Sequence, residues 1–398
     1  MTHKKSLISR VEQILGALVS FQSVPGTDGT PILDWVSAYL QHHGLQVHRL
    51  PFPPADAQTG APANIFTSIG PHCDGGICLS AHLDVVPAAA QNWAHPPFEL
   101  TVEDKMHSKD AGTRRFYGRG TTDMKGFAAL MLAMVPEWIQ QQRSRPLHLA
   151  FTYDEESGCR GAPYLIEQIG RQIPRPEAVI VGEPTGMIPV IGHKGGTSCY
   201  SEIHGVPAHS STPSAGASAI YIANDIITFL RDTADGLRRS ETQDDRFSPS
   251  HTTISVGEVH GGTARNIIPE ECHIVWEIRS IPGENAHTIL QQLESYITDA
   301  VLAPYRQRFS GVEVRTTLTA EYPPLVPQPD SAAVQFVRHA GCEAAVKCVT
   351  FGTEAGHYQT AGIPAVVWGP GDIAKAHITD EYIDVQALAD FLDHLIRL

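Results

Sequence analysis

The chain has 398 residues, which is long for one simple domain, so two domains are the natural expectation. Its formal net charge of -14 argues against nucleic acid or an anionic membrane as a partner. The 7 cysteines include no Cys-x-x-Cys pair, and no apolar run approaches the length of a transmembrane helix. These features favour a cytoplasmic protein with reduced thiols and no targeting segment.

The first part of the chain alternates helix and strand patterns. Leu7, Val11 and Leu18 recur at helical spacing and predict an amphipathic helix near the N-terminus. Further along, short β-branched runs bounded by turn residues predict buried strands of a parallel sheet. Four such runs lie at residues 77–79, 147–153, 178–181 and 365–368. Together these patterns predict an α/β sandwich.

A different pattern begins after Lys194 and predicts an inserted α+β domain. A strand, a helix, two strands, a helix and a strand follow one another, at 197–204, 220–230, 252–259, 272–281, 289–301 and 312–318, with a polar loop at 232–249. This order is that of the split ferredoxin-like unit. Helices at 331–340 and 385–398 then mark a return to α/β character. We therefore expect a discontinuous catalytic domain of residues 1–187 and 321–398 and an inserted lid of residues 188–320.

Acids and histidines follow the apolar runs of the predicted sheet. Ligand sites in parallel sheets form beyond the carboxyl ends of the strands, so we expect these side chains to meet at one edge. They are His82 and Asp84 after the first run, Glu155 and Glu156 after the second, Glu183 after the third and His377 after the fourth. Carboxylate and imidazole ligands suit Zn²⁺, and also Co²⁺ or Mn²⁺. The pattern therefore predicts a metal-dependent hydrolase.

More than one interpretation is open for three acids, Asp123, Glu155 and Glu156. Asp123 precedes an apolar helix pattern, so it is either a helix cap or a carboxylate that bridges two cations. Glu155 and Glu156 are neighbours whose side chains point different ways on an extended backbone. One can therefore bind a metal while the other serves as general base for the attacking water, although two surface glutamates after a strand are also common. Asp84 is close enough in sequence to orient the imidazole of His82.

Ten stretches, in order along nearly the whole chain, carry a family resemblance. They are SAHLDVVPA (80–88), YGRGTTDMKG (117–126), YDEESGCRGA (153–162), VGEPT (181–185), HKGG (193–196), GVPAHSSTP (205–213), GGTARNIIPEEC (261–272), WEIRSIPG (276–283), FGTEAGHYQTAGIP (351–364) and GPGDIAKAHITDEYI (369–383). The chain resembles the di-zinc aminoacylase and peptidase family that includes acetylornithine deacetylase, succinyl-diaminopimelate desuccinylase and carboxypeptidase G. The GTEA and GPGDI stretches are most similar to the acetylornithine deacetylase branch.

The resemblance implies a zinc-peptidase-like mixed sheet sandwiched by helices, with an inserted ferredoxin-like lid that also serves for dimerisation. It also implies two Zn²⁺ ions, for which Co²⁺ or Mn²⁺ can substitute. His82 and Glu183 match the ligands of the first ion, Glu156 and His377 match those of the second, and Asp123 matches the bridging carboxylate. In the same pattern, Glu155 is the general base and Asp84 is the partner of His82.

The resemblance also implies roles for residues of the lid. His209 matches a histidine that stabilises the oxyanion in the active site of the partner subunit, which implies a homodimer formed through the lids. Lys194, Asn266 and Arg279 match lid residues that contact the substrate, and Thr353 matches a contact from the catalytic domain. A guanidinium is apt for binding a carboxylate, but Arg279 can equally form a surface ion pair with Glu277 or another neighbour.

Two stretches depart from the family pattern. The charged stretch 103–115 is longer than expected, and Ile378-Thr379-Asp380 lacks a proline before the aspartate. The implied reaction is hydrolysis of an N-acyl amino acid, with N2-acetyl-L-ornithine as the first choice of substrate. Alternatives are another N-acyl amino acid, such as succinyl-diaminopimelate, or a dipeptide. An alternative of another class is a non-catalytic relative that binds a ligand through the lid.

Overall fold

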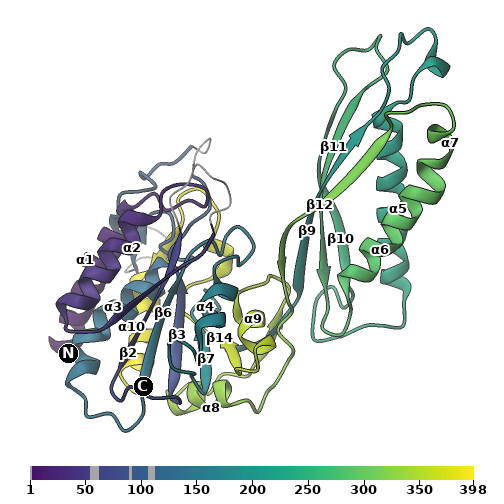
Figure 1. Cartoon of the computed structure of the whole chain (residues 1–398). Helices are drawn as coiled ribbons and strands as arrows, with labels where there is room; N and C mark the ends of the chain where they lie inside the picture. Colours follow the sequence, from purple (N-terminus) through teal and green to yellow (C-terminus); the bar gives the residue numbers. More distant parts are fainter. Residues whose placement is uncertain (1, 54–61, 89–91, 106–112) are drawn as a thin grey trace. The chain divides into compact units, whose positions relative to one another are not determined.

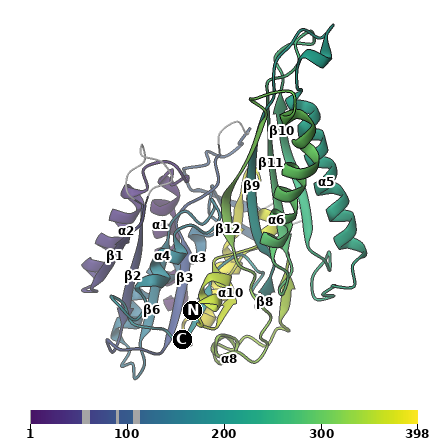
Figure 2. The same ribbon diagram turned by 45° about the vertical axis from the view of Figure 1, so that its right-hand side comes forward.

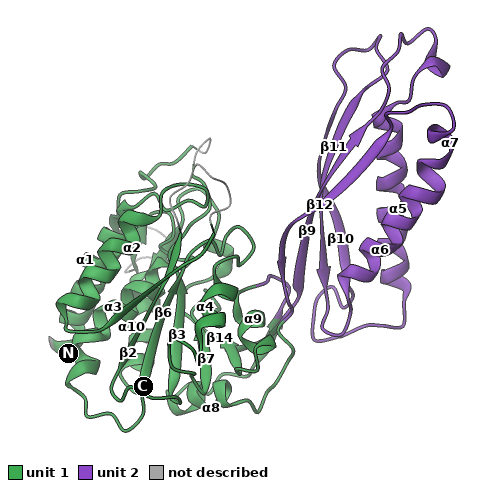
Figure 3. Ribbon diagram, in the orientation of Figure 1, with its two compact units in different colours: residues 1–192, 325–348, 353–398 green, residues 193–324, 349–352 purple. Residues whose placement is uncertain are grey.

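The computed structural model describes residues 2–53, 62–88, 92–105 and 113–398, and its chain forms two compact units (Figure 3). Unit 1 comprises Met1–Gly192, Leu325–Cys348 and Thr353–Leu398, and unit 2 comprises His193–Pro324 and Val349–Gly352. Unit 2 is thus an insertion into unit 1. The domain boundaries predicted after residues 187 and 320 lie a few residues before these transitions.

Unit 1 is built on a mixed sheet of eight strands (Figure 1). The strand order is β1-β2-β6-β3-β7-β14-β8-β13. The strands are β1 (Val47–Pro51), β2 (Ala63–Ile69), β3 (Ile77–His82), β6 (Leu147–Thr152), β7 (Ala178–Val181), β8 (Val190–His193), β13 (Lys347–Val349) and β14 (Ala365–Val367). Strands β6, β3, β7 and β14 are parallel neighbours, as the four apolar runs predict. Their carboxyl ends therefore meet at one edge.

Helices cover both faces of this sheet. Side chains alternate between the faces of β3: Ile77 and Leu79 join the main apolar core, whereas the Ser80 hydroxyl contacts Tyr358 of a helix on the opposite face. The core also contains residues of α1 (Thr2–Ser20), α2 (Thr30–His42), α3 (Lys125–Gln140), α8 (Ala332–His339) and α10 (Val385–Leu395). On the opposite side, α4 (Ala162–Gln168) contacts α9 (Ala355–Thr360). None of the helices in the described ranges is long and apolar enough to cross a membrane.

Unit 1 also contains a small antiparallel sheet. Its order is β15-β5-β4, with β4 at Thr101–Lys105, β5 at Thr113–Tyr117 and β15 at Tyr382–Asp384. The two ends of the charged stretch 103–115 therefore belong to β4 and β5, and its residues 106–112 lie outside the described residues. Strand β15 follows a short 3₁₀ turn, Ile373–Lys375, and the segment that carries His377.

Unit 2 has the predicted ferredoxin-like order (Figure 2). Its sheet has the order β10-β11-β9-β12 and all neighbours are antiparallel. The strands are β9 (Gly195–His204), β10 (Thr253–Gly261), β11 (Glu271–Ser280) and β12 (Glu313–Tyr322). Helices α5 (Ala219–Arg239) and α6 (Ala286–Tyr296) pack on one face and share an apolar core with the sheet. Short turns complete the unit: a 3₁₀ turn at Pro213–Ala215, a π turn at Ile297–Val301 and α7 at Ala303–Arg306.

One sequence prediction in unit 2 is wrong. The segment 232–249 was expected to be a loop throughout, but α5 continues to Arg239. The charged residues of this stretch occupy the solvent face of a long amphipathic helix, where Asp235 pairs with Arg238, while Leu237 packs against the unit's core. A dense run of charges therefore marks an exposed helix face here as well as a loop.

Candidate metal centre

Neighbouring parallel strands deliver the predicted ligands to one edge of the main sheet. His82 is the last residue of β3, and Glu156 lies in the turn that follows β6. Glu183 comes directly after β7, and His377 lies in the segment between β14 and β15. Asp123 reaches the same place from the turn between β5 and α3. The strand order therefore brings residues that are far apart in the sequence into one cluster.

The cluster divides into two sets of ligand atoms that share Asp123. One set is His82, Asp123 and Glu183, the other is Asp123, Glu156 and His377, and the ligand atoms of each set lie within 4.8 Å of one another. Asp123 Oδ1 lies 3.1 Å from His82 Nε2, and its Oδ2 lies 3.3 Å from His377 Nε2. The two oxygens of one carboxylate thus face two different imidazoles, which is the arrangement of a bridging ligand.

The imidazole of His82 is oriented by the main chain. Its Nδ1 lies 2.9 Å from the carbonyl oxygen of Asp84, which can only accept, so Nδ1 carries the hydrogen and Nε2 faces the carboxylates. The carboxylate of Asp84 lies farther away, at 3.7 Å, and accepts the main-chain N–H of Glu156 at 2.9 Å. Sequence reasoning expected the Asp84 side chain to orient His82. In the structure this side chain lies beside the imidazole and also positions the Glu156 turn.

The electrostatics of the cluster favour bound cations. Burial raises the pKa of Glu183 well above its usual value, and the charge of Asp123 adds to this effect. Burial likewise raises the pKa of Glu156. Buried like charges are costly unless opposite charges compensate them, and the two histidines alone are fewer than the carboxylates. Carboxylate oxygens mixed with imidazole nitrogens are a donor set that Zn²⁺, Co²⁺ and Mn²⁺ accept, so these residues fit a metal centre.

Both histidines hold protons tightly when no cation is present. Burial opposes the charged form of His82, but the hydrogen bond to Asp123 and the neighbouring carboxylates raise its pKa well above the usual value. Hydrogen bonds to Asp123 and Glu156 raise the pKa of His377 to about 10. Burial by itself would raise the pKa of Asp123, but the two imidazoles outweigh it and hold this pKa well below its usual range.

Loading the metal-free protein with Zn²⁺ at pH 7 is therefore expected to release protons. An imidazole must be neutral and a carboxyl ionised to bind a cation, so His82 and His377 should each lose a proton, and Glu183, whose pKa is also raised, adds to the release. Because the metal competes with these protons, its apparent affinity should increase as the pH rises and decrease as the pH falls. Calorimetric titration in buffers of different ionisation enthalpy measures the number of protons. Zinc uptake without proton release would contradict this description of the site.

Glu155 lies beside the cluster but belongs to neither ligand set. Burial raises its pKa to about 8, because the charge of His82 only partly offsets the effect of burial and of the nearby carboxylates. The thiol of Cys159 donates to Glu155 Oε1 at 3.2 Å. An acid held next to a candidate metal centre, outside both ligand sets, has the position of a general base. Sequence reasoning did not single out Cys159, although it lies in the same YDEESGCRGA stretch.

In unit 2, His209 and Asn266 are both exposed and lie on adjacent segments. Ser210 donates its main-chain N–H to the carbonyl oxygen of Asn266, and His209 forms an isolated bridge with Ile267. The Nδ1 atom of His209 accepts the main-chain N–H of Ser211 at 3.1 Å. The proton of the neutral imidazole therefore resides on Nε2, where it can donate a hydrogen bond outward.

The other predicted substrate contacts already have protein partners. In unit 2, Lys194 is buried, its ammonium group donates to the carbonyl oxygen of His251, and burial lowers its pKa. Arg279 pairs with Glu277 at 2.8 Å, which is the alternative that the sequence left open. In unit 1, Thr353 is buried and its hydroxyl accepts the main-chain N–H of Ala355, at the start of α9.

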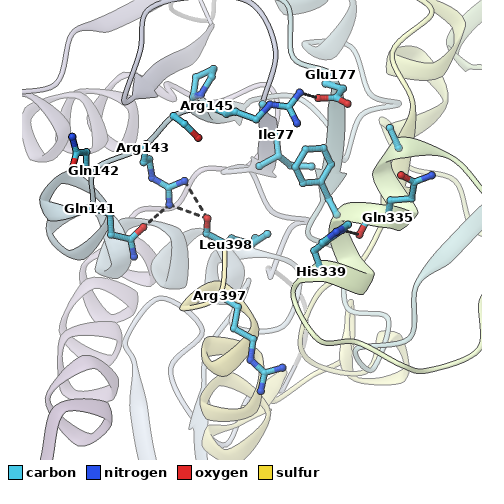
Figure 4. A pocket seen from close by; sticks show the side chains of 15 residues that line it. Ile77, Gln141, Gln142, Arg143, Arg145, Glu177, Gln335, His339, Arg397 and Leu398 are labelled. Atoms are coloured by element: carbon cyan, nitrogen blue, oxygen red, sulfur yellow. Dashed lines mark hydrogen bonds and ion pairs between the residues drawn. The ribbon is translucent and has the colours of Figure 1, made fainter.

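A surface pocket of unit 1 lies at the other end of the strands. It includes Ile77, the first residue of β3, whereas His82 ends the same strand (Figure 4). Arg143 and Arg145 also line it, and Glu177, the one acid among its lining residues, pairs with Arg145. This pocket therefore provides no cluster of acids and histidines of the kind found beyond the carboxyl ends of the strands.

The fold and the ligand cluster together define a class, the metal-dependent hydrolases that hold their cations beyond the carboxyl ends of parallel strands. The chain belongs to the peptidase family M20/M25/M40, whose family model matches residues 78–398. It is 32% identical over 392 residues to an acetylornithine deacetylase from Salmonella arizonae, and the match covers 96% of this chain and 95% of that protein. The predicted family and its metal dependence are thus confirmed.

Solved structures share the fold. Human carnosine dipeptidase 1 superposes with a TM-score of 0.74 at 16% sequence identity, over 100% of this chain and 97% of that chain. A dinuclear metal-binding peptidase of the M20 family from Bacillus subtilis gives a TM-score of 0.61 at 15% identity, over 99% of this chain and 97% of that chain. The predicted fold class, a mixed sheet between helices with an inserted α+β domain, is confirmed.

Proposed function

We propose that this hydrolase cleaves the amide bond of N-acyl amino acids and that its substrate is N2-acetyl-L-ornithine, which gives L-ornithine and acetate. The choice of substrate rests on the 32% identity to an acetylornithine deacetylase over 96% of the chain. The observation that supports the chemistry is the pair of ligand sets sharing Asp123 beside Glu155. The protein would act in arginine biosynthesis, in the cytoplasm.

Two Zn²⁺ ions, or Co²⁺ or Mn²⁺ in their place, would be held by these ligand sets. His82 and Glu183 would hold the first, Glu156 and His377 the second, and Asp123 would bridge them. When bound, the cations polarise the amide carbonyl and lower the pKa of water. The dinuclear metal-binding relative from Bacillus subtilis supports the number of cations.

Glu155 would serve as general base and then as general acid. Its carboxylate accepts a proton from the attacking water as the new bond to the carbonyl carbon forms. It delivers that proton to the amide nitrogen as the C–N bond breaks, so the amine leaves neutral and the carboxylate is regenerated. The Cys159 thiol, which donates to Oε1, keeps the side chain beside the cluster during both transfers.

The lid would complete the site. His209 would donate its Nε2–H to the oxyanion of the tetrahedral intermediate in the partner subunit, within a homodimer formed through the lids. Arg279, Asn266 and Lys194 would bind the substrate, with Thr353 as a further contact from unit 1. Arg279 can bind the α-carboxylate of a substrate bidentately, and it would exchange its ion pair with Glu277 to do so.

The substrate is tested by amine release from N2-acetyl-L-ornithine, N-succinyl-L,L-diaminopimelate and a dipeptide, each with zinc-loaded and chelator-treated protein. We expect a metal-dependent kcat/KM of about 10⁴ M⁻¹s⁻¹ or more for N2-acetyl-L-ornithine, a value usual for enzymes, and at least about 100-fold less for the others. A higher value for the dipeptide or the succinyl compound would transfer the assignment to that substrate class. Equal, metal-independent traces for all three would overturn the proposed reaction.

A further inference from the structure

A buried acid outside both ligand sets, Glu381, joins the two segments that carry Asp123 and His377. Its side chain has an exposed fraction of 0%. It directly precedes β15, which pairs with β5 so that Tyr382 lies opposite Tyr117. The turn of Asp123 continues directly from β5, and the segment of His377 leads into β15. The short β5–β15 pair therefore brings both ligand-bearing segments to Glu381.

Both carboxylate oxygens of Glu381 accept hydrogen bonds from the Asp123 turn. Oε2 accepts from Arg119 Nη1 at 2.8 Å and from the main-chain N–H of Gly120 at 3.0 Å. Oε1 accepts from the main-chain N–H groups of Thr122 at 2.9 Å and of Asp123 at 3.1 Å. One carboxylate thus binds three main-chain N–H groups of the turn as well as the Arg119 side chain. Charge-assisted hydrogen bonds of this kind are stronger than neutral ones.

Further contacts tie the same two segments together. The carbonyl oxygen of Glu381 accepts the main-chain N–H of Gly118 at 2.9 Å. The hydroxyl of Thr122 donates to the carbonyl oxygen of Tyr382 at 2.6 Å. Arg119, itself 1% exposed, compensates the buried charge of Glu381. These contacts fix the main chain at Asp123. The two side-chain oxygens of Asp123 then face His82 and His377.

We propose that Glu381 is a positioning residue of the metal centre, which fixes the backbone of residues 118–123 against the His377 segment so that Asp123 can bridge the two ligand sets. The inference rests on the proposed role of Asp123 and His377 as ligands. It adds a residue that acts through the main chain of a ligand. Partners that orient metal ligands commonly contribute 10- to 100-fold to metal affinity or activity.

The variant Glu381→Gln tests this role. Glutamine has almost the same shape, but its amide NH₂ must face N–H donors of the turn, so at least one pair of these hydrogen bonds becomes a contact between donors. We expect the zinc affinity to fall by about 10- to 100-fold. With zinc limiting, kcat should fall in parallel while KM changes little. Glu381→Asp, which keeps the charge, should recover part of the affinity.

Asp384→Asn is the matched control. Asp384 is the last residue of β15, its side chain is 43% exposed, and it pairs with Arg115 at 2.9 Å, away from the Asp123 turn. Its amide variant removes one carboxylate from the strand that follows Glu381 and should leave the zinc affinity within about 3-fold of wild type. Zinc affinity is measured by competition with a chromophoric chelator, so that the result does not depend on the substrate.

The outcomes separate this inference from the proposed function. Wild-type affinity in Glu381→Gln would overturn the positioning role, while leaving the metal centre intact. A wild-type protein that takes up no zinc would overturn the proposed function and this inference with it. If Glu381→Gln fails to fold, amide hydrogen exchange in the metal-free wild-type protein tests whether Glu381 fixes the Asp123 turn. Protection at Gly120, Thr122 and Asp123 supports the role, and exchange as fast as in an exposed loop overturns it.

Discussion

Replacing Glu155 with glutamine is expected to abolish turnover and to leave the bound metal in place. An amide cannot accept the proton of the attacking water, and general acid–base catalysis contributes about 10²- to 10⁴-fold to rates. Glu155 belongs to neither ligand set, so its loss should not release a cation. The measurements are kcat for N2-acetyl-L-ornithine and zinc content by elemental analysis.

Glu167→Gln is the matched control for this prediction. Glu167 lies on α4, a short distance along the chain, and its side chain is exposed. The control should keep both turnover and zinc at wild-type levels. If Glu155→Gln kept activity within about 10-fold of wild type, the proton transfer would belong to another group. If it lost zinc together with activity, Glu155 would be a ligand.

Asp123→Ala is expected to remove both cations, whereas His377→Ala should remove one. The oxygens of Asp123 serve both ligand sets, and His377 belongs to one of them. The first variant leaves His82 and Glu183 on one side and Glu156 and His377 on the other, with no group between them. We expect its zinc affinity to fall by more than about 100-fold at both sites, since even the loss of an orienting partner costs up to that amount.

The comparison between these two variants is more informative than either alone. Zinc titration of His377→Ala should show one remaining site with an affinity near that of wild type. Titration of Asp123→Ala should show none in the same concentration range. Two intact sites in Asp123→Ala would contradict the bridging role. Loss of both sites in His377→Ala would mean that the two ligand sets are not independent.

Much of the site was predictable because four neighbouring strands of the main sheet are parallel. Short apolar runs identified β3, β6, β7 and β14, and the rule that parallel strands place their carboxyl ends at one edge brought His82, Glu183 and His377 together from distant positions. In the inserted unit, the order of the strand and helix patterns predicted the succession β9-α5-β10-β11-α6-β12. These inferences needed only the periods of helices and strands.

Other features depend on contacts that no local pattern records. The sequence could place Asp84 near His82, but not show that its main-chain oxygen receives the Nδ1–H while its side chain holds the Glu156 turn. Glu381 accepts from Gly120 across 261 positions of chain, and apart from the Arg119 side chain its donors in the turn are main-chain N–H groups, which any residue except proline provides. Its sequence signal is only an acid before a short strand in the GPGDIAKAHITDEYI stretch.

The dinuclear centre is the claim on which the rest of the account depends, and anomalous diffraction tests it most directly. Data collected at the zinc absorption edge from crystals of the zinc-loaded protein should show two peaks about 3.5–4 Å apart on either side of Asp123. One should lie beside His82 and Glu183, and the other beside Glu156 and His377. A single peak, or peaks elsewhere in the chain, would contradict the two-metal account and the bridging role of Asp123.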